Sequence, residues 1–148
     1  MAALIHIVAD AVVTLLNAGV AANAFALDFT AARVRVIDLK ATTSLKVVVL
    51  GTAEQVSQAA RDEDAVDLRI EIGIVRRIDR GTFDADVDLM VELVEQVRDY
   101  VRDHNVAGAE QTDIDLAPLY DHGRLLEKGL FAAVVVATYR VHRDREEA

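Results

Sequence analysis

The sequence predicts a single α/β domain of α+β type, with helices packed on a mixed, mostly antiparallel sheet of four strands. Three observations support this fold class. Two segments carry apolar residues at helical spacing, one segment alternates apolar and polar residues, and one is apolar throughout. A chain of 148 residues has the size of one domain, so residues 1–148 are expected to form a single unit.

The first predicted element is a helix over residues 3–18, expected to end at Gly19. Its apolar residues share one face and its polar residues lie opposite. The apolar set is Leu4, Val8, Val12, Leu15 and Leu16, and the polar set is His6, Asp10, Thr14 and Asn17. No Lys or Arg precedes Arg33, and polar residues interrupt the apolar run. We therefore expect neither a signal peptide nor a membrane span here.

Three strands are predicted next, over residues 31–38, 45–50 and 66–78. The clearest signal lies in the third, where every second residue from Val66 to Ile74 is apolar and the residues between them are Asp67, Arg69, Glu71 and Gly73. Such a period of two is typical of a half-buried strand. The three strands are expected to pair as antiparallel neighbours, with residues 51–65 as a polar loop.

A second helix is predicted over residues 84–104 and a last strand over residues 130–142. Acidic residues crowd the start of the helix and basic residues lie near its end, which complements the helix dipole. Residues 131–137 are continuously apolar, as in a central strand covered on both faces. The helix is expected to carry a crossover to this strand, and residues 107–129 are expected to form a long loop.

Composition and motifs exclude several classes of function. The formal net charge of −9 disfavours sequence-independent nucleic-acid binding and contact with an anionic membrane. The chain has no cysteine, no glycine-rich phosphate loop, no nucleophilic serine elbow and no helical pair of histidines. Asp84, Asp86 and Asp88 have calcium-loop spacing, but Leu89 occupies the position that needs glycine. We predict no catalytic, metal or cofactor site, and no enzyme activity.

The residues that we single out as candidate contact residues are charged or aromatic side chains at strand ends and in predicted loops. They are Arg33, Arg35, Arg61, Asp62, Arg76, Arg77, Tyr120 and Asp121. We expect them to form an interface with other subunits. The alternative from another class of function is a small ligand-binding or enzymatic domain. Asp121 and His122 would be the first candidates for its site residues.

As a whole, the pattern resembles the neck and tail-completion proteins of long-tailed phages, above all the tail-terminator group. Three stretches carry the resemblance. They are residues 7–17 (IVADAVVTLLN); residues 45–49 (LKVVV), followed by Arg61-Asp62, residues 67–74 (DLRIEIGI) and residues 88–95 (DLMVELVE); and residues 118–121 (PLYD) followed by residues 137–141 (ATYRV). Where such proteins often have proline after the second strand, this chain has Leu50 and Gly51.

The resemblance implies a structural virion protein that is not an enzyme and has no cofactor. It implies a ring, commonly a hexamer, that ends growth of the tail tube and joins the tail to the head connector. The implied partners are further copies of itself, the tail tube protein and the head connector or stopper protein, with DNA passing through unbound and no membrane involved. The implied location is the virion of a phage, prophage or gene-transfer particle, assembled in the host cytoplasm. A head-closure or minor tail component is the alternative within this class.

Overall fold

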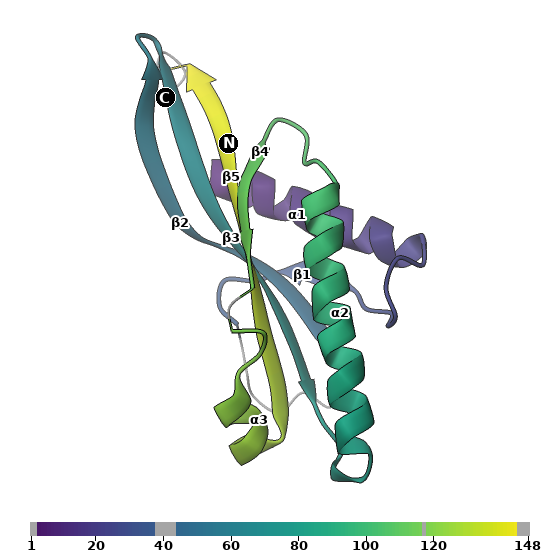
Figure 1. The fold of residues 1–148 in the computed structure, drawn as a ribbon. Helices are drawn as coiled ribbons and strands as arrows, with labels where there is room; N and C mark the ends of the chain where they lie inside the picture. Colours follow the sequence, from purple (N-terminus) through teal and green to yellow (C-terminus); the bar gives the residue numbers. More distant parts are fainter. Residues whose placement is uncertain (1–2, 38–43, 117, 145–148) are drawn as a thin grey trace.

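The computed structural model describes residues 3–37, 44–116 and 118–144. These residues form a mixed sheet of five strands with three α-helices, a short 3-10 helix and one shared hydrophobic core (Figure 1). The predicted fold class is confirmed, but the sheet has one strand more than expected.

The elements follow one another along the chain in an order close to the predicted one. Their bounds are α1 (Leu4–Ala21), β1 (Ala31–Arg33), β2 (Lys46–Ala60), β3 (Glu63–Arg77), the 3-10 helix η1 (Arg80–Thr82), α2 (Phe83–Asp103), β4 (Glu110–Asp115), α3 (His122–Lys128) and β5 (Leu130–Asp144). The sheet order is β1-β2-β3-β5-β4, and every neighbouring pair is antiparallel except β1 with β2. The long strands β2, β3 and β5 therefore form the middle of the sheet.

The sheet has one buried face and one partly open face, which follow from the alternation of side chains along each strand. The helix face packs on α1 and α2 and holds the core. Its fully buried strand residues include Val47, Val49, Ile70, Ile72, Ile74, Val135 and Tyr139. The open face carries the residues between them, including the predicted polar set of β3. The alternation predicted for residues 66–74 is thus confirmed.

Helix α1 contributes Val8, Val12 and Leu16 to this core. Among the described helices, it is the one whose length and apolar composition would also suit a membrane span. Its buried side chains instead contact the strands, so we interpret it as a core helix. The helix does not end at Gly19, as expected, but continues to Ala21. Gly19 is buried where an added Cβ would lie 2.7 Å from the Phe25 ring, so close packing, and not helix termination, requires the glycine.

Four further expectations were wrong. Residues 51–65 are not a loop, because β2 and β3 continue through them as a hairpin with a turn at Arg61 and Asp62. The predicted loop over residues 107–129 contains β4 and α3. The strand predicted over residues 31–38 spans only Ala31–Arg33 and runs parallel to β2; residue 38 lies outside the described residues. Finally, β5 is covered on one face alone, because Val134 and Val136 on the open face are only half-buried.

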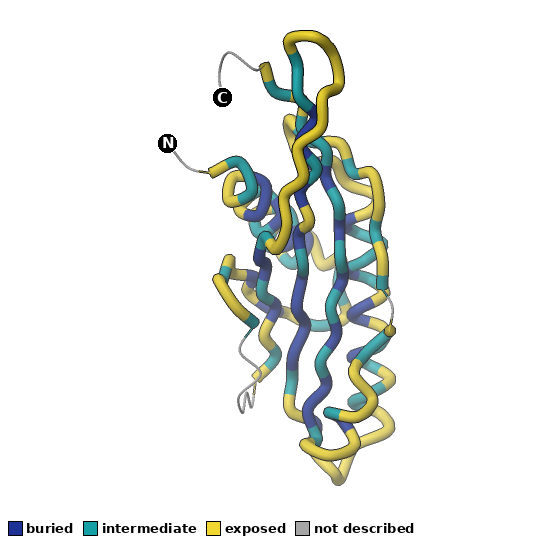
Figure 2. The backbone as a smooth tube through the Cα atoms, turned by 90° about the vertical axis from the view of Figure 1, so that its left-hand side faces the viewer, coloured by how far each residue is buried: buried dark blue, intermediate teal, exposed yellow. Residues whose placement is uncertain are grey.

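The outer part of the hairpin extends past the helices as an arm, which we define as residues 52–64 (Figures 1 and 2). Every residue from Thr52 to Asp62 is exposed, whereas the inner part of β2 is largely buried. The last residues of β5 pair with β3 alongside the arm, from Val66↔Val141 to Glu63↔Asp144. The arm is therefore a paired extension of the sheet with few core contacts of its own.

Candidate functional site

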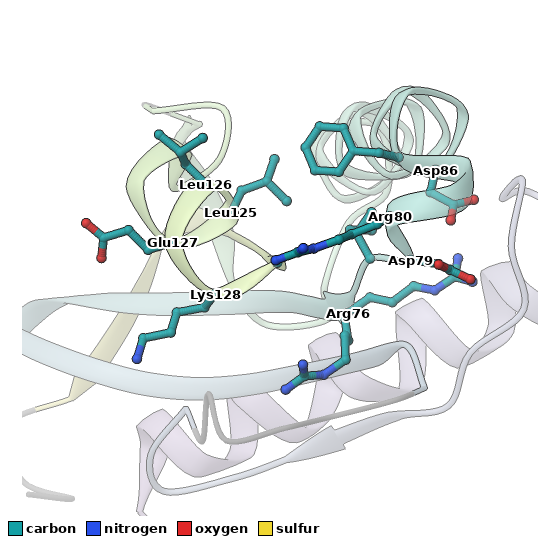
Figure 3. A pocket seen from close by; sticks show the side chains of 12 residues that line it. Arg76, Asp79, Arg80, Asp86, Leu125, Leu126, Glu127 and Lys128 are labelled. Carbon is teal, nitrogen blue, oxygen red and sulfur yellow. The ribbon is translucent and has the colours of Figure 1, made fainter.

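An open groove of about 890 Å³ lies beside α3, at the end of the molecule opposite the arm (Figure 1), and Figure 3 shows its lining. The end of β3, the 3-10 helix η1, the start of α2 and the last turn of α3 line it. Its polar lining contains four cations, Arg76, Arg77, Arg80 and Lys128, and three acids, Asp79, Asp86 and Glu127. We call this feature the basic groove, because its net charge of +1 (four minus three) contrasts with −9 for the chain.

The four cations of the basic groove have no ion-pair partner among the described residues. Two of the neighbouring acids are engaged elsewhere. The Asp79 carboxylate accepts a hydrogen bond of 3.0 Å from the Gly81 backbone N–H, and the Asp86 carboxylate accepts one of 2.6 Å from the Thr82 hydroxyl. The cations are therefore available to carboxylates or other anionic groups from outside the chain.

Two large apolar side chains border the same groove. The Leu126 side chain is 86% exposed and Phe83 is 38% exposed, although residues of this kind usually lie in a core. In Figure 3, Arg80 extends between the leucines of α3 and the start of α2. Arginine and large apolar groups side by side are characteristic of protein interfaces, whereas a lone exposed leucine carries no such meaning.

Local sequence explains why α3 forms one wall of the groove. Asp121 caps the helix, because its carboxylate accepts a hydrogen bond of 3.0 Å from the Arg124 backbone N–H. Gly129 follows the last turn with φ of 64°, the left-handed conformation that favours glycine after a helix. The Ile78 N–H then donates to the Gly129 carbonyl at 2.8 Å, which ties the helix end to the end of β3.

Arg76 and Arg77 are the only two predicted contact residues in the basic groove. The other predicted residues lie elsewhere. Arg61 and Asp62 form the tip of the arm, separated from Arg76 by the length of β3, about 45 Å for a strand of 15 residues. The structure therefore divides the predicted set between the two ends of the molecule.

The remaining predicted residues are engaged locally, apart from the exposed Arg35. Arg33 donates a hydrogen bond of 2.7 Å to Asp10 of α1, within the same chain. Tyr120 stacks on the His122 ring at a centroid distance of 4.1 Å and also contacts Phe131. Asp121 caps α3 and pairs with Arg124 at 3.6 Å.

Tyr120, Asp121 and His122 also border a second open groove of about 550 Å³, which includes Arg69 and Glu71 on the open face. This arrangement has a positioned histidine, but its neighbouring carboxylate caps a helix. No group of three or more potential metal ligands gathers in the part of the chain that the structure describes.

Sequence reasoning noted Arg80 beside Arg76 and Arg77, but it missed Lys128, Phe83 and Leu126 of the basic groove. Arg80 closely follows the Arg76-Arg77 pair along the chain, so the local charge was visible. Lys128 and Leu126 lay inside a predicted loop, where no orientation could be assigned. The signal that could have placed them is the spacing of Asp121 and Gly129, which bracket a short helix.

The charges on the open face form a second, weaker feature at the base of the arm. Arg140 of β5 donates two hydrogen bonds to Asp67 of β3, at 2.8 and 3.1 Å. The hydrogen bond from Arg140 lowers the pKa of Asp67 below its ordinary value of 3.8. Both side chains remain partly exposed, so the pair aligns two strands more than it stabilises the fold.

The sequence of this chain matches no protein-family model and no curated protein.

Proposed function

We propose that this protein is a structural virion subunit that assembles into a ring at the head-proximal end of a phage tail. In this role it ends growth of the tail tube and joins the tail to the head connector, without catalysis and without a cofactor. The ring is commonly a hexamer in the group that the sequence resembles. A head-closure or minor tail component is the alternative role for the same kind of subunit.

The main observation in support of this proposal is the composition of the basic groove. The groove presents four cations without described partners, next to exposed Leu126 and Phe83, on a chain with 25 acidic and 16 basic residues. Copies of the same chain therefore offer abundant carboxylates to each other's grooves. A contact between two different surfaces of identical subunits is heterologous, and it closes into a ring when the rotation between subunits allows.

The overall acidity supports the proposal in a second way. A channel that DNA must pass through needs walls that do not bind phosphates, and a net charge of −9 meets that need. Cationic side chains are compatible with such a channel when they face a neighbouring subunit instead of the bore. We accordingly assign the basic groove to the contact between copies.

The experiment is negative-stain imaging of the purified protein, alone and mixed with tail tubes. Rings with a central hole, or caps on tube ends, are the expected result. Copurification with tail tubes, as opposed to capsid connectors, separates the tail-terminator role from head closure. Particles that neither form rings nor bind tubes or connectors would refute the proposal, and a thermal-shift screen with metals and nucleotides would then test the ligand-binding alternative.

A further inference from the structure

The outer half of the sheet has two free edges that match each other. β1 pairs with β2 only at Val47–Val49, so no described strand pairs with the outer side of β2 along the arm. At the other edge of the sheet, β4 pairs only with β5 among the described strands. Each edge leaves a row of backbone N–H and C=O groups that another strand can pair with.

The β2 edge has a regular stretch, residues 53–58, between two register shifts, one between Gly51 and Ala53 and one between Gln58 and Ala60. Residues 52–60 (TAEQVSQAA) contain one charged residue, Glu54, and no proline or lysine. Val56 is 50% exposed in the middle of this edge. Monomeric proteins commonly protect a long edge with charges, proline or β-bulges. Between its two register shifts, this edge is regular and carries one charge, which favours pairing with another strand.

We infer that the outer edge of β2 pairs with β4 of a second copy of this chain, so that the sheet continues from subunit to subunit. This inference rests on the proposed ring and adds a second contact between neighbouring copies, at the opposite end of the subunit from the basic groove. Along the outer half of the sheet, β2, β3, β5 and β4 alternate in direction. Because β4 runs opposite to β2, β4 of one copy lies antiparallel to β2 of the next with both subunits in the same orientation. Cyclic symmetry requires that common orientation.

Side chains on the two edges are also compatible face by face. On the open face, β4 presents three exposed acids, Glu110, Asp113 and Asp115, whose partners in β5 are Arg140, Thr138 and Val136. The open face of the β2 edge presents uncharged side chains, Ala53, Gln55 and Ser57, opposite Arg69, Asp67 and Ala65 of β3. Continuing the sheet therefore places no carboxylate of β4 against a carboxylate of β2 on this face.

On the helix face, the same continuation brings apolar and amide side chains together. β4 presents Gln111 and Ile114, and β2 presents Val56 and Gln58, with Glu54 as the single charge. Within one subunit, Ile114 is level with Gly51 across the sheet, and Val56 lies five residues further out. We set the register between copies by the β-branched pair of Val56 with Ile114, a favourable cross-strand contact, and the resulting stagger tilts the strands relative to the ring axis. If β4 paired with β4 of another copy, the acids of one β4 would lie opposite the acids of the other on the open face. If β2 paired with β2, the outer edges of both β4 strands would stay unpaired.

The absence of cysteine from the chain makes disulfide cross-linking a direct test. Val56→Cys and Ile114→Cys are prepared as separate proteins, mixed and oxidised. The inference predicts a disulfide-linked dimer that contains one chain of each kind. The double variant, with both substitutions in one chain, is expected to give a ladder of linked chains. The matched control pairs Gln55→Cys with Ile114→Cys, whose thiols lie on opposite faces and should cross-link far less.

The cross-linking results test the edge pairing, and the images test the ring. Cross-linking of Val56→Cys alone would show a two-fold β2 contact and overturn the inference. Failure of the mixed pair to cross-link would overturn it as well, and imaging of the same oxidised samples then tests the ring independently. Rings without cross-links refute only the edge pairing, whereas the absence of both rings and tube binding refutes the proposed function itself.

Discussion

The inner and outer halves of β2 belong to one strand but lie in opposite environments. Val47 and Val49 of the inner half are fully buried on the helix face, whereas every residue from Thr52 to Ala60 is exposed. The β3 side of the same hairpin stays apolar further out, since Val66 and Leu68 remain buried. Backbone pairing therefore continues along this strand beyond the point where burial ends. The inner half stabilises the subunit, and the outer half leaves an exposed edge.

The sharpest test of this comparison is a pair of truncations at the two halves. Ile72→Ala removes a fully buried side chain opposite Val49 and should lower the free energy of unfolding by about 2–5 kcal/mol. Val56→Ala on the arm should change it by less than about 0.5 kcal/mol. Urea unfolding of both variants measures the difference. Equal effects would show that the arm packs as firmly as the inner sheet.

The boundary between the two halves lies at Gly51, and a side chain there should be costly. An added Cβ would overlap the Ile5 side chain of α1, so Gly51→Ala forces the helix start away from the strand. We expect a loss of about 1–3 kcal/mol in the free energy of unfolding. Adding Ile5→Ala to this variant removes both overlapping carbons, Cγ1 and Cδ1, and should recover part of the loss. Failure to recover would mean that the Ile5 contact does not explain the glycine.

A smaller effect is expected at Tyr139, the largest fully buried side chain, where the helix face approaches β4. Its hydroxyl accepts a hydrogen bond of 3.3 Å from the Gln111 amide, which also donates to the Val101 carbonyl at 3.1 Å. Tyr139→Phe should cost about 0.5–1.5 kcal/mol, measured by the same urea unfolding. A larger loss would show that this hydrogen bond holds β4 in place.

The same tyrosine predicts a dependence on alkaline pH. Burial raises the pKa of Tyr139 above its ordinary value of 10.0, while the hydrogen bond from Gln111 offsets part of the rise. The folded state then keeps the proton longer than the unfolded state, so its contribution is complete below pH 10.0 and is lost as the pH rises through the folded pKa. Tyr139→Phe should lack this part of the alkaline loss in unfolding measurements on both sides of that pH.

The smallest effect is expected at the base of the arm, for the Asp67–Arg140 pair. Because the pKa of Asp67 is lowered, the pair contributes above pH 3.8, and its contribution is lost as the pH falls through the folded pKa. Asp67→Asn should therefore differ slightly from the parent protein at neutral pH and not at strongly acidic pH. Asp113→Asn, which changes an exposed acid of β4, is the matched control. A large neutral-pH loss for Asp67→Asn alone would give the pair a structural role.

The elements that sequence predicted well are those in which burial imposes a pattern. The alternation in β3 and the apolar stripe of α2 reflect a sheet and a helix that each pack one side on the core. The outer part of β2 was not predicted as a strand, because both of its faces are exposed and its residues show no alternation of apolar and polar side chains. Its turn at Arg61 and Asp62 also lacks the Asn-Gly signal, and neither residue has a positive φ.

The candidate site was predictable only in part. Arg76 and Arg77 stood out as charges at the end of a strand, but the walls of the basic groove come from segments far apart in the chain. β4 has one apolar residue among its six, Ile114, so its sequence resembles a loop. Tertiary pairing with β5, and not local propensity, makes it a strand.

The role of the basic groove in assembly is tested by the light-scattering mass of the parent protein and of the Arg76→Glu/Arg77→Glu variant, each alone and with tail tubes. We expect the parent protein to assemble, as free rings or on tube ends, and the charge-reversed variant to stay a folded monomer in both settings. Circular dichroism of the variant confirms its folding. A variant that assembles as the parent does would contradict the assignment of the basic groove to the subunit contact.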